Sequence, residues 1–95
     1  MMLADVKDAL RLSGTDLDIE VQDLIDAAKA DLQLSGVHAD KIVDTDPLIK
    51  RAVIVYCKAH FGYEEPAQAE LFMKSYNALK SHLALSQEYT GVSGP

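Results

Sequence analysis

Residues 46–62 decide the fold of this chain, and they read DPLIKRAVIVYCKAHFG. Asp46 followed by Pro47 signals a helix start, because a carboxylate caps free N–H groups and proline already holds a helical φ. Gly62 supplies the usual left-handed stop. The β-branched run at residues 52–57 also fits a buried strand, but the helical period continues on both sides of it. We therefore predict a helix from Pro47 to Phe61.

The apolar positions of this central helix form two stripes. A helix that is apolar over so much of its circumference must be surrounded, either by its own domain or by neighbouring copies. We expect a single domain of 95 residues to leave part of it uncovered. A neighbouring copy would then complete the cover. The two stripes are Leu48, Ala52, Val55 and Ala59, and Ile49, Val53, Tyr56 and His60.

Three further helices are predicted from apolar periodicity and from start and stop signals. Residues 37–45 read as a loop or a single turn, and residues 62–66 as a turn. The fold class is therefore all-α, a small bundle of about four helices. It divides into a helical domain at residues 1–85 and a flexible C-terminal tail at residues 86–95, which lacks a helical pattern. The helices span Leu3 to Leu12, then Thr15 or Asp16 (as cap) to Leu34, and Pro66 to Leu85, with Ser13-Gly14 and Ser35-Gly36 as stops.

Composition narrows the class of protein. Hydrophobic residues make up 48% and aromatic residues 6%, without tryptophan, so the core must consist mostly of aliphatic side chains. The single Cys57 cannot form an internal disulfide and fits a reducing compartment. The longest apolar run, residues 52–57, is far shorter than the roughly 18–20 residues of a membrane span. Acids at Asp5 and Asp8 argue against a signal peptide. We expect a soluble protein without a membrane partner.

The net charge of −6 is unevenly distributed along the chain. Residues 1–46 hold eleven acids and four bases, a net charge of −7, while residues 47–95 hold four acids and five bases, a net charge of +1. Neither half offers the dense basic patch that a nucleic-acid duplex requires. On the second helix, acids gather opposite the apolar stripe, either as a solvated face or as a charged wall towards a channel or a basic partner. They are Asp16, Glu20, Asp23, Asp26 and Asp31.

No pattern in the sequence indicates catalysis, a cofactor or a metal. Cys57 and His60 have ligand spacing, but no second pair completes the four ligands of a structural zinc site. Glu64 and Glu65 are adjacent in a turn and point apart, so they do not form a catalytic pair of acids. They are better explained as negative charges at the N-terminus of a helix that starts at Pro66. Neither Ser-Gly pair matches a phosphate-binding loop. The aromatic residues Tyr56, Phe61, Tyr63, Phe72 and Tyr76 are expected to pack the last two helices together.

Several stretches, in this order and spacing, resemble the head–tail connector proteins of tailed phages. They are residues 2–12, 16–20, 24–29, 46–52, 56–62 and 76–83, so the resemblance covers about residues 2–90. It implies an all-helical adaptor that forms a ring, typically of twelve copies, under the portal protein. Such a ring bridges the portal to the next head-completion (stopper) protein, and DNA passes through it without specific binding. The expected location is the virion neck, with the host cytoplasm during assembly.

The resemblance also implies roles for particular residues. An acidic face towards the channel would let DNA slide by repulsion. The alternative is a small helical interaction or regulatory module unrelated to the virion. Expected channel-facing acids are Asp16, Glu20, Asp23 and Asp26; expected subunit-interface residues are Ile49, Val53, Tyr56, Phe72 and Tyr76; expected portal contacts are Gln87, Glu88, Tyr89 and Thr90.

Overall fold

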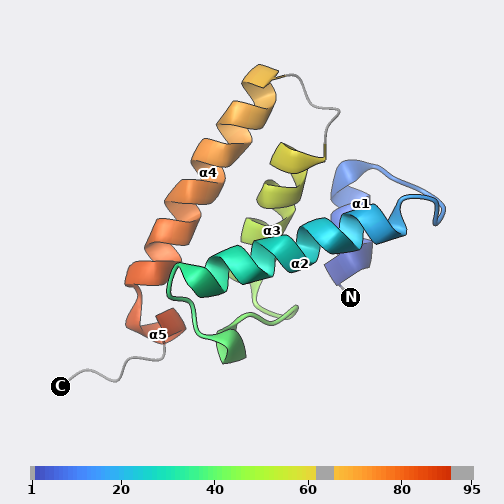
Figure 1. The fold of residues 1–95 in the computed structure, drawn as a ribbon. Helices are drawn as coiled ribbons and strands as arrows, with labels where there is room; N and C mark the ends of the chain where they lie inside the picture. The colour runs from blue at the N-terminus through green and yellow to red at the C-terminus, as the bar shows by residue number, and fades with distance from the viewer. Residues whose placement is uncertain (1, 62–65, 91–95) are drawn as a thin grey trace.

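The chain is seen in a computed structural model that describes residues 2–61 and 66–90. The fold has four main helices, of which α1, α2 and α4 pack around α3, and the described residues contain no strand (Figure 1). This confirms the all-α prediction. The stop at Gly62, the turn at residues 62–65 and the end of the tail, residues 91–95, lie outside the described residues. The elements are α1 (Met2–Leu10), α2 (Asp18–Leu34), the single-turn 3-10 helix η1 (Ala39–Lys41), α3 (Pro47–His60), α4 (Pro66–Leu85) and the short α5 (Gln87–Thr90).

Helix α3 begins where its capping signal predicts. The Oδ1 atom of Asp46 accepts hydrogen bonds from the backbone N–H groups of Leu48 at 2.9 Å and Ile49 at 3.2 Å. Pro47 occupies the first turn, where its missing N–H costs nothing. The predicted start is confirmed, and α4 also has its predicted bounds.

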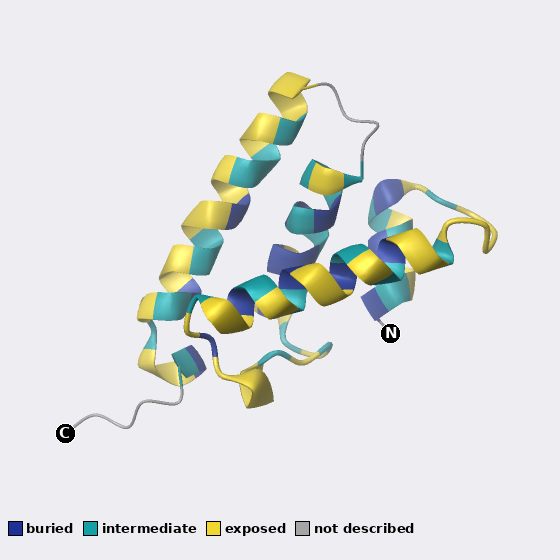
Figure 2. Cartoon of the chain, in the orientation of Figure 1, coloured by how far each residue is buried: buried dark blue, intermediate teal, exposed yellow. Residues whose placement is uncertain are grey.

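One subunit encloses most of α3, but not all of it. Helices α1, α2 and α4 all pack against α3 and cover it from three directions. Figure 2 shows buried positions along the inner side of α2 and along α3. A helix wrapped by three others needs only a narrow outer stripe to be polar, so most of both apolar stripes is core, although Leu48 is 40% exposed. The enclosed residues of α3 are Ile49, Ala52, Val53, Val55 and Cys57, each at most 2% exposed.

Helix α2 ends at the predicted Ser35-Gly36 stop. The N–H of Val37 donates to the carbonyl of Leu32, and that of Gly36 to the carbonyl of Gln33, both at 3.1 Å. Gly36 has φ +115°, which a side chain would strain. Val37 and Leu32 are both buried, so this Schellman cap also adds to the core.

Helix α1 ends earlier than predicted. The same pair of hydrogen bonds closes it, from Leu12 N–H to Lys7 carbonyl and from Arg11 N–H to Asp8 carbonyl. The left-handed position is occupied by Arg11, with φ +59°. The Ser-Gly pair therefore lies in the following turn and does not stop the helix.

The start of α2 also differs from the prediction. Its N-cap is Leu17, which makes no side-chain capping bond, so neither Thr15 nor Asp16 is the cap. A turn precedes the helix, because the Asp18 N–H donates to the Thr15 carbonyl. The Asp18 carboxylate lies 2.7 Å from the Lys7 ammonium, and this ion pair joins α1 to the start of α2.

The tail is not irregular throughout residues 86–95, because Gln87–Thr90 form the short helix α5. Tyr89 is buried, and its hydroxyl donates to Asp46 Oδ1 at 3.2 Å. Its carbonyl accepts from the His38 N–H at 2.7 Å. One buried aromatic ring thus holds α5 against the start of α3 and the loop after α2.

Candidate interaction surfaces

The acidic residues of α2 form an exposed face that we call the acidic face, defined by Glu20, Asp23 and Asp26. All three are exposed, as is Asp16 in the turn before the helix. None forms an ion pair with another described residue, although Gln22 donates to Asp26 at 3.0 Å. This matches the expected exposure of these acids; what they face in an assembly stays a prediction.

Two large apolar side chains lie on the same side of α2 as the acidic face. Ile19 is 81% exposed and Leu34 is 88% exposed. Both fall on the arc opposite the buried positions of α2, by the helical period of about 100° per residue. The surface is therefore mixed, acidic in its middle and apolar at its two ends, which is more typical of a protein contact than of a purely solvated helix.

Asp31 does not belong to the solvated side of α2 as predicted. Its Oδ2 atom accepts hydrogen bonds from the Tyr76 hydroxyl at 2.5 Å and from the Lys80 ammonium at 3.1 Å. Asp31 borders the apolar stripe of α2, next to buried Leu32, and it therefore points towards α4. In the sequence, the signal for this position is that Asp31 follows Ala28 by three residues and directly precedes Leu32, both of which belong to the buried stripe of α2.

This polar cluster shifts the ionisation of its members. Burial raises the pKa of Asp31, but the hydrogen bonds from Tyr76 and Lys80 outweigh it and hold that pKa below its usual value. Burial, and then the hydrogen bond to Asp31, raise the pKa of Tyr76 far above its usual value. Both shifts favour a carboxylate that accepts from a neutral phenol, so the cluster links α2 to α4 at neutral pH.

Aromatic residues join α3 to α4, as predicted. The rings of Tyr56 and Tyr76 meet edge to face with centroids 5.1 Å apart, and Tyr56 also contacts His60 at 4.3 Å. The Lys58 ammonium lies 5.4 Å from the ring of Phe72. Tyr63 lies outside the described residues.

The structure separates the five expected subunit-interface residues into two groups. Ile49, Val53 and Tyr76 are 0% exposed in a single subunit, so their side chains belong to its own core and are not left for a neighbour. Tyr56 and Phe72 are half-buried and retain surface. The apolar pattern of α3 contained no signal that distinguishes an internal partner helix from an external one.

One side of α3 remains only partly covered, and sequence reasoning did not identify which side it is. Arg51, Ile54, Lys58 and Phe61 recur at intervals of three, four and three residues, so they share one face of the helix. Arg51 is exposed and the other three are half-buried. We call these four residues the α3 stripe. It is basic and apolar, whereas the acidic face of α2 is acidic and apolar.

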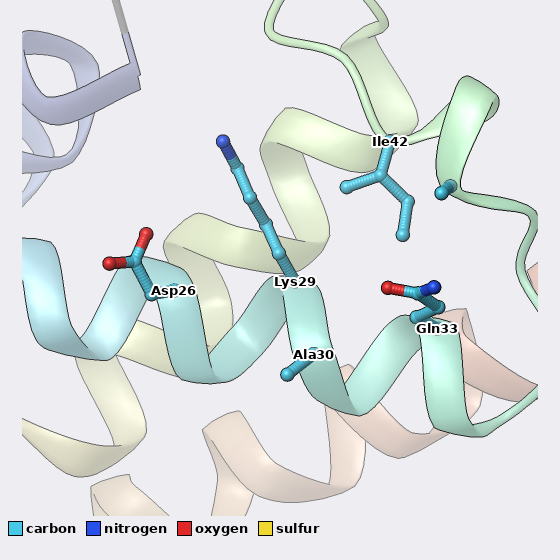
Figure 3. Close-up of a pocket in the computed structure, with 6 residues that line it drawn as sticks. Asp26, Lys29, Ala30, Gln33 and Ile42 are labelled. Atoms are coloured by element: carbon cyan, nitrogen blue, oxygen red, sulfur yellow. The ribbon is translucent and has the colours of Figure 1, made fainter.

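A hollow lies between α2 and η1, and it is open to solvent (Figure 3). Lys29, Gln33 and Ile42 surround its opening, and its volume is about 320 Å³. The Lys29 ammonium is within 3.5 Å of Asp44, so its charge is already partnered.

The predicted portal contacts now have different surroundings. Gln87 and Glu88 are exposed on α5, whereas Tyr89 is buried against Asp46 and Thr90 is half-buried. Gln87 and Glu88 are therefore the most accessible of the four side chains, Thr90 retains part of its surface, and Tyr89 is enclosed.

Among residues 2–61 and 66–90, no three His, Cys, Asp or Glu side chains gather as a metal site. Burial raises the pKa of the Cys57 thiol to about 12, so this thiol is not a reactive thiolate at neutral pH. No helix in the described part of the chain has the length and hydropathy to cross a membrane.

The fold and these surfaces define a class of protein: a small all-helical domain with charged outer faces and no candidate catalytic cluster in its described part. The family model described as Phage connector protein matches residues 2–90. The chain belongs to this phage connector family, which confirms the resemblance. Searches of curated proteins and of solved structures gave no significant match. A connector family is structural, which fits the prediction that the chain is not an enzyme.

Proposed function

We propose that this chain is a head–tail adaptor of a tailed phage or prophage. It assembles as a ring, typically of twelve copies, under the portal and bridges it to the head-completion (stopper) protein. DNA passes through the ring, and the protein resides in the virion neck. The observation that carries the proposal is the family match over residues 2–90, which spans every described helix.

The enclosed core supports assembly in two stages. Ile25, Ile49 and Tyr76 are 0% exposed within one subunit, so the fold does not depend on a neighbour for its core. A subunit that folds first and is then placed by the portal suits a ring that must form at one vertex only. The portal then acts as the template that raises the local concentration of subunits.

The exposed side chains of α5 support a role in portal attachment. Gln87 and Glu88 project from a helix that Tyr89 anchors to the domain. A deletion of the tail would also remove this anchor, so it would mix attachment with stability. Gln87→Ala with Glu88→Ala changes only exposed positions and is the cleaner variant.

The acidic face has two candidate positions in such a ring. Facing the channel, it would repel DNA and let it slide. Facing a neighbour, it would use its apolar ends, Ile19 and Leu34, together with its charge. The large exposure of these two side chains favours the second position, which is developed in the next subsection.

Capsids that carry an assembled portal but no other neck protein test the proposal. The purified chain should sediment with them, and should not sediment with capsids that lack the portal. The Gln87→Ala/Glu88→Ala variant should be retained less well, while its thermal midpoint stays unchanged. A chain that ignores portal-containing capsids would support the alternative, an interaction or regulatory module unrelated to the virion.

A further inference from the structure

We propose that the α3 stripe docks the acidic face of α2 from a second copy of this chain. The inference rests on the proposed ring and names the surfaces that would join its subunits. Its occupant is chosen by charge. One side of the molecule is basic and apolar, another is acidic and apolar, and each keeps side-chain surface exposed in the subunit.

The α3 stripe offers positive charge that the subunit does not neutralise. Neither Arg51 nor Lys58 makes an ion pair with another described residue, and the Lys58 ammonium lies over the ring of Phe72. By contrast, Lys50 lies 3.4 Å from the Asp5 carboxylate and is already partnered. Between the two unneutralised cations lies half-buried Ile54, so a partner would meet charge around an apolar centre.

The acidic face offers the complementary pattern. Asp23 and Asp26 lie in the middle of the outer side of α2, with the small side chains Ala27 and Ala30 between and beside them. Small residues allow another helix to approach closely, and the carboxylates can then reach Arg or Lys side chains. An arginine in such a contact can bind a carboxylate with two parallel hydrogen bonds.

The two surfaces point in different directions, which makes the contact head-to-tail. Helix α2 packs against α3 through its buried side and crosses in front of it (Figure 1). The acidic face therefore looks away from α3, while the α3 stripe lies on the outer arc of α3 and borders α4, whose Phe72 contacts Lys58. A contact between two different faces repeats from copy to copy, and it closes into a ring when the rotation allows.

The net charge of −6 does not oppose such a contact at physiological salt. Repulsion between exposed charges is screened beyond about 8 Å, whereas carboxylate–guanidinium pairs act at a few ångströms. Charge complementarity of this kind sets the register of a contact more than its strength. A weak contact between free subunits is therefore expected, which the portal would reinforce.

Disulfide trapping detects a weak contact directly in the purified full chain. The variant Ala30→Cys/Ile54→Cys places one thiol on each surface, and the native Cys57 is buried. Under mild oxidation we expect a ladder of dimers, trimers and larger species on a non-reducing gel. Ser81→Cys/Ile54→Cys is the matched control, because Ser81 is exposed on α4, outside both surfaces; it should give no such ladder.

Charge reversal then tests the pairing. In the double-cysteine background, Asp23→Lys/Asp26→Lys makes both surfaces basic, and Arg51→Glu/Lys58→Glu makes both acidic. Each reversed variant alone should lose the ladder by about tenfold or more, because like charges then face each other. An equimolar mixture of the two should restore it, since the basic chains can alternate with the acidic ones.

Three results would overturn the inference. The first is a double-cysteine chain that forms no more ladder than its control. The second is efficient dimerisation of Ala30→Cys alone, which would indicate a symmetric contact. The third is a mixture that stays unlinked, as expected if the acids face a channel. None of these depends on the portal, so retention on portal-containing capsids tests the adaptor role separately.

Discussion

Asp31 shows how much one side chain depends on its neighbours in space. Four other acids at or near α2 are exposed, but this one accepts hydrogen bonds from Tyr76 and Lys80 on α4. The cluster links two helices that otherwise meet mainly through α3. Its removal should therefore loosen α4 while leaving the packing of α1 and α2 on α3 intact.

The first prediction concerns the Tyr76 hydroxyl. Tyr76→Phe keeps the ring in the core but removes the donor to Asp31, so we expect a loss of about 1–2 kcal/mol in the free energy of unfolding. Urea denaturation followed by circular dichroism measures it. In a double-mutant cycle with Asp31→Asn, the two losses should be less than additive. Strict additivity would show that the hydrogen bond contributes nothing.

The second prediction is that the stability of the folded chain depends on pH in the acid range. The pKa of Asp31 is lower in the folded chain than its usual value of 3.8. Its contribution to stability is therefore complete above the unfolded-state pKa and is lost as the pH falls through the folded-state pKa. Urea midpoints between about pH 5 and pH 2 should fall more steeply for the wild-type chain than for Asp31→Asn. Parallel curves would contradict the assignment.

The third prediction uses the left-handed residue that ends α1. Arg11 has φ +59°, a conformation that costs a side-chain-bearing residue about 1 kcal/mol. Arg11→Gly should raise the free energy of unfolding by about 0.5–1 kcal/mol. Gly36→Ala, at the equivalent position of α2, should lower it by a similar amount, because Gly36 has φ +115°. Thermal denaturation of both variants checks the opposite signs.

At the scale of elements, Asp46 connects three parts of the chain. Its carboxylate caps α3 through Leu48 and Ile49, and it also accepts from the Tyr89 hydroxyl of α5. The short helix α5 is too small to be stable alone, so it depends on this contact and on the burial of Tyr89.

The fourth prediction follows from this double role. Asp46→Ala should cost about 1–2 kcal/mol through the lost cap. It should also raise the hydrogen-exchange rate of the His38 amide, which donates to the Tyr89 carbonyl. Asp46→Asn keeps a capping oxygen and should cost less. If the His38 amide exchanges at the wild-type rate in Asp46→Ala, then α5 does not depend on the cap.

At the scale of the whole molecule, the buried core implies an independent subunit. The fifth prediction is that the purified chain sediments as a monomer of 10.4 kDa at micromolar concentration. The physical reason is that the core of the described residues closes within the subunit, and that the acidic face and the α3 stripe both carry charge. A stable ring in dilute solution, without the portal, would contradict this.

Much of the fold follows from local sequence signals. The Asp46-Pro47 start, the Gly36 stop and the bounds of α4 were all predicted, because caps and helical periods depend on residues close together in the chain. The end of α1 at Arg11 was not predicted, because a non-glycine left-handed residue has no sequence signature. The family could also be inferred, from the order and spacing of these segments.

By itself, the sequence determined the four main helices, the all-α fold class and the uneven distribution of charge. Only the tertiary structure decided that most of α3 is enclosed within one subunit, that Asp31 binds Tyr76 and that Tyr89 anchors α5. The reason is physical. An apolar stripe specifies that it must be covered but not by which surface, and a carboxylate is solvated or partnered according to groups brought near it by chain folding.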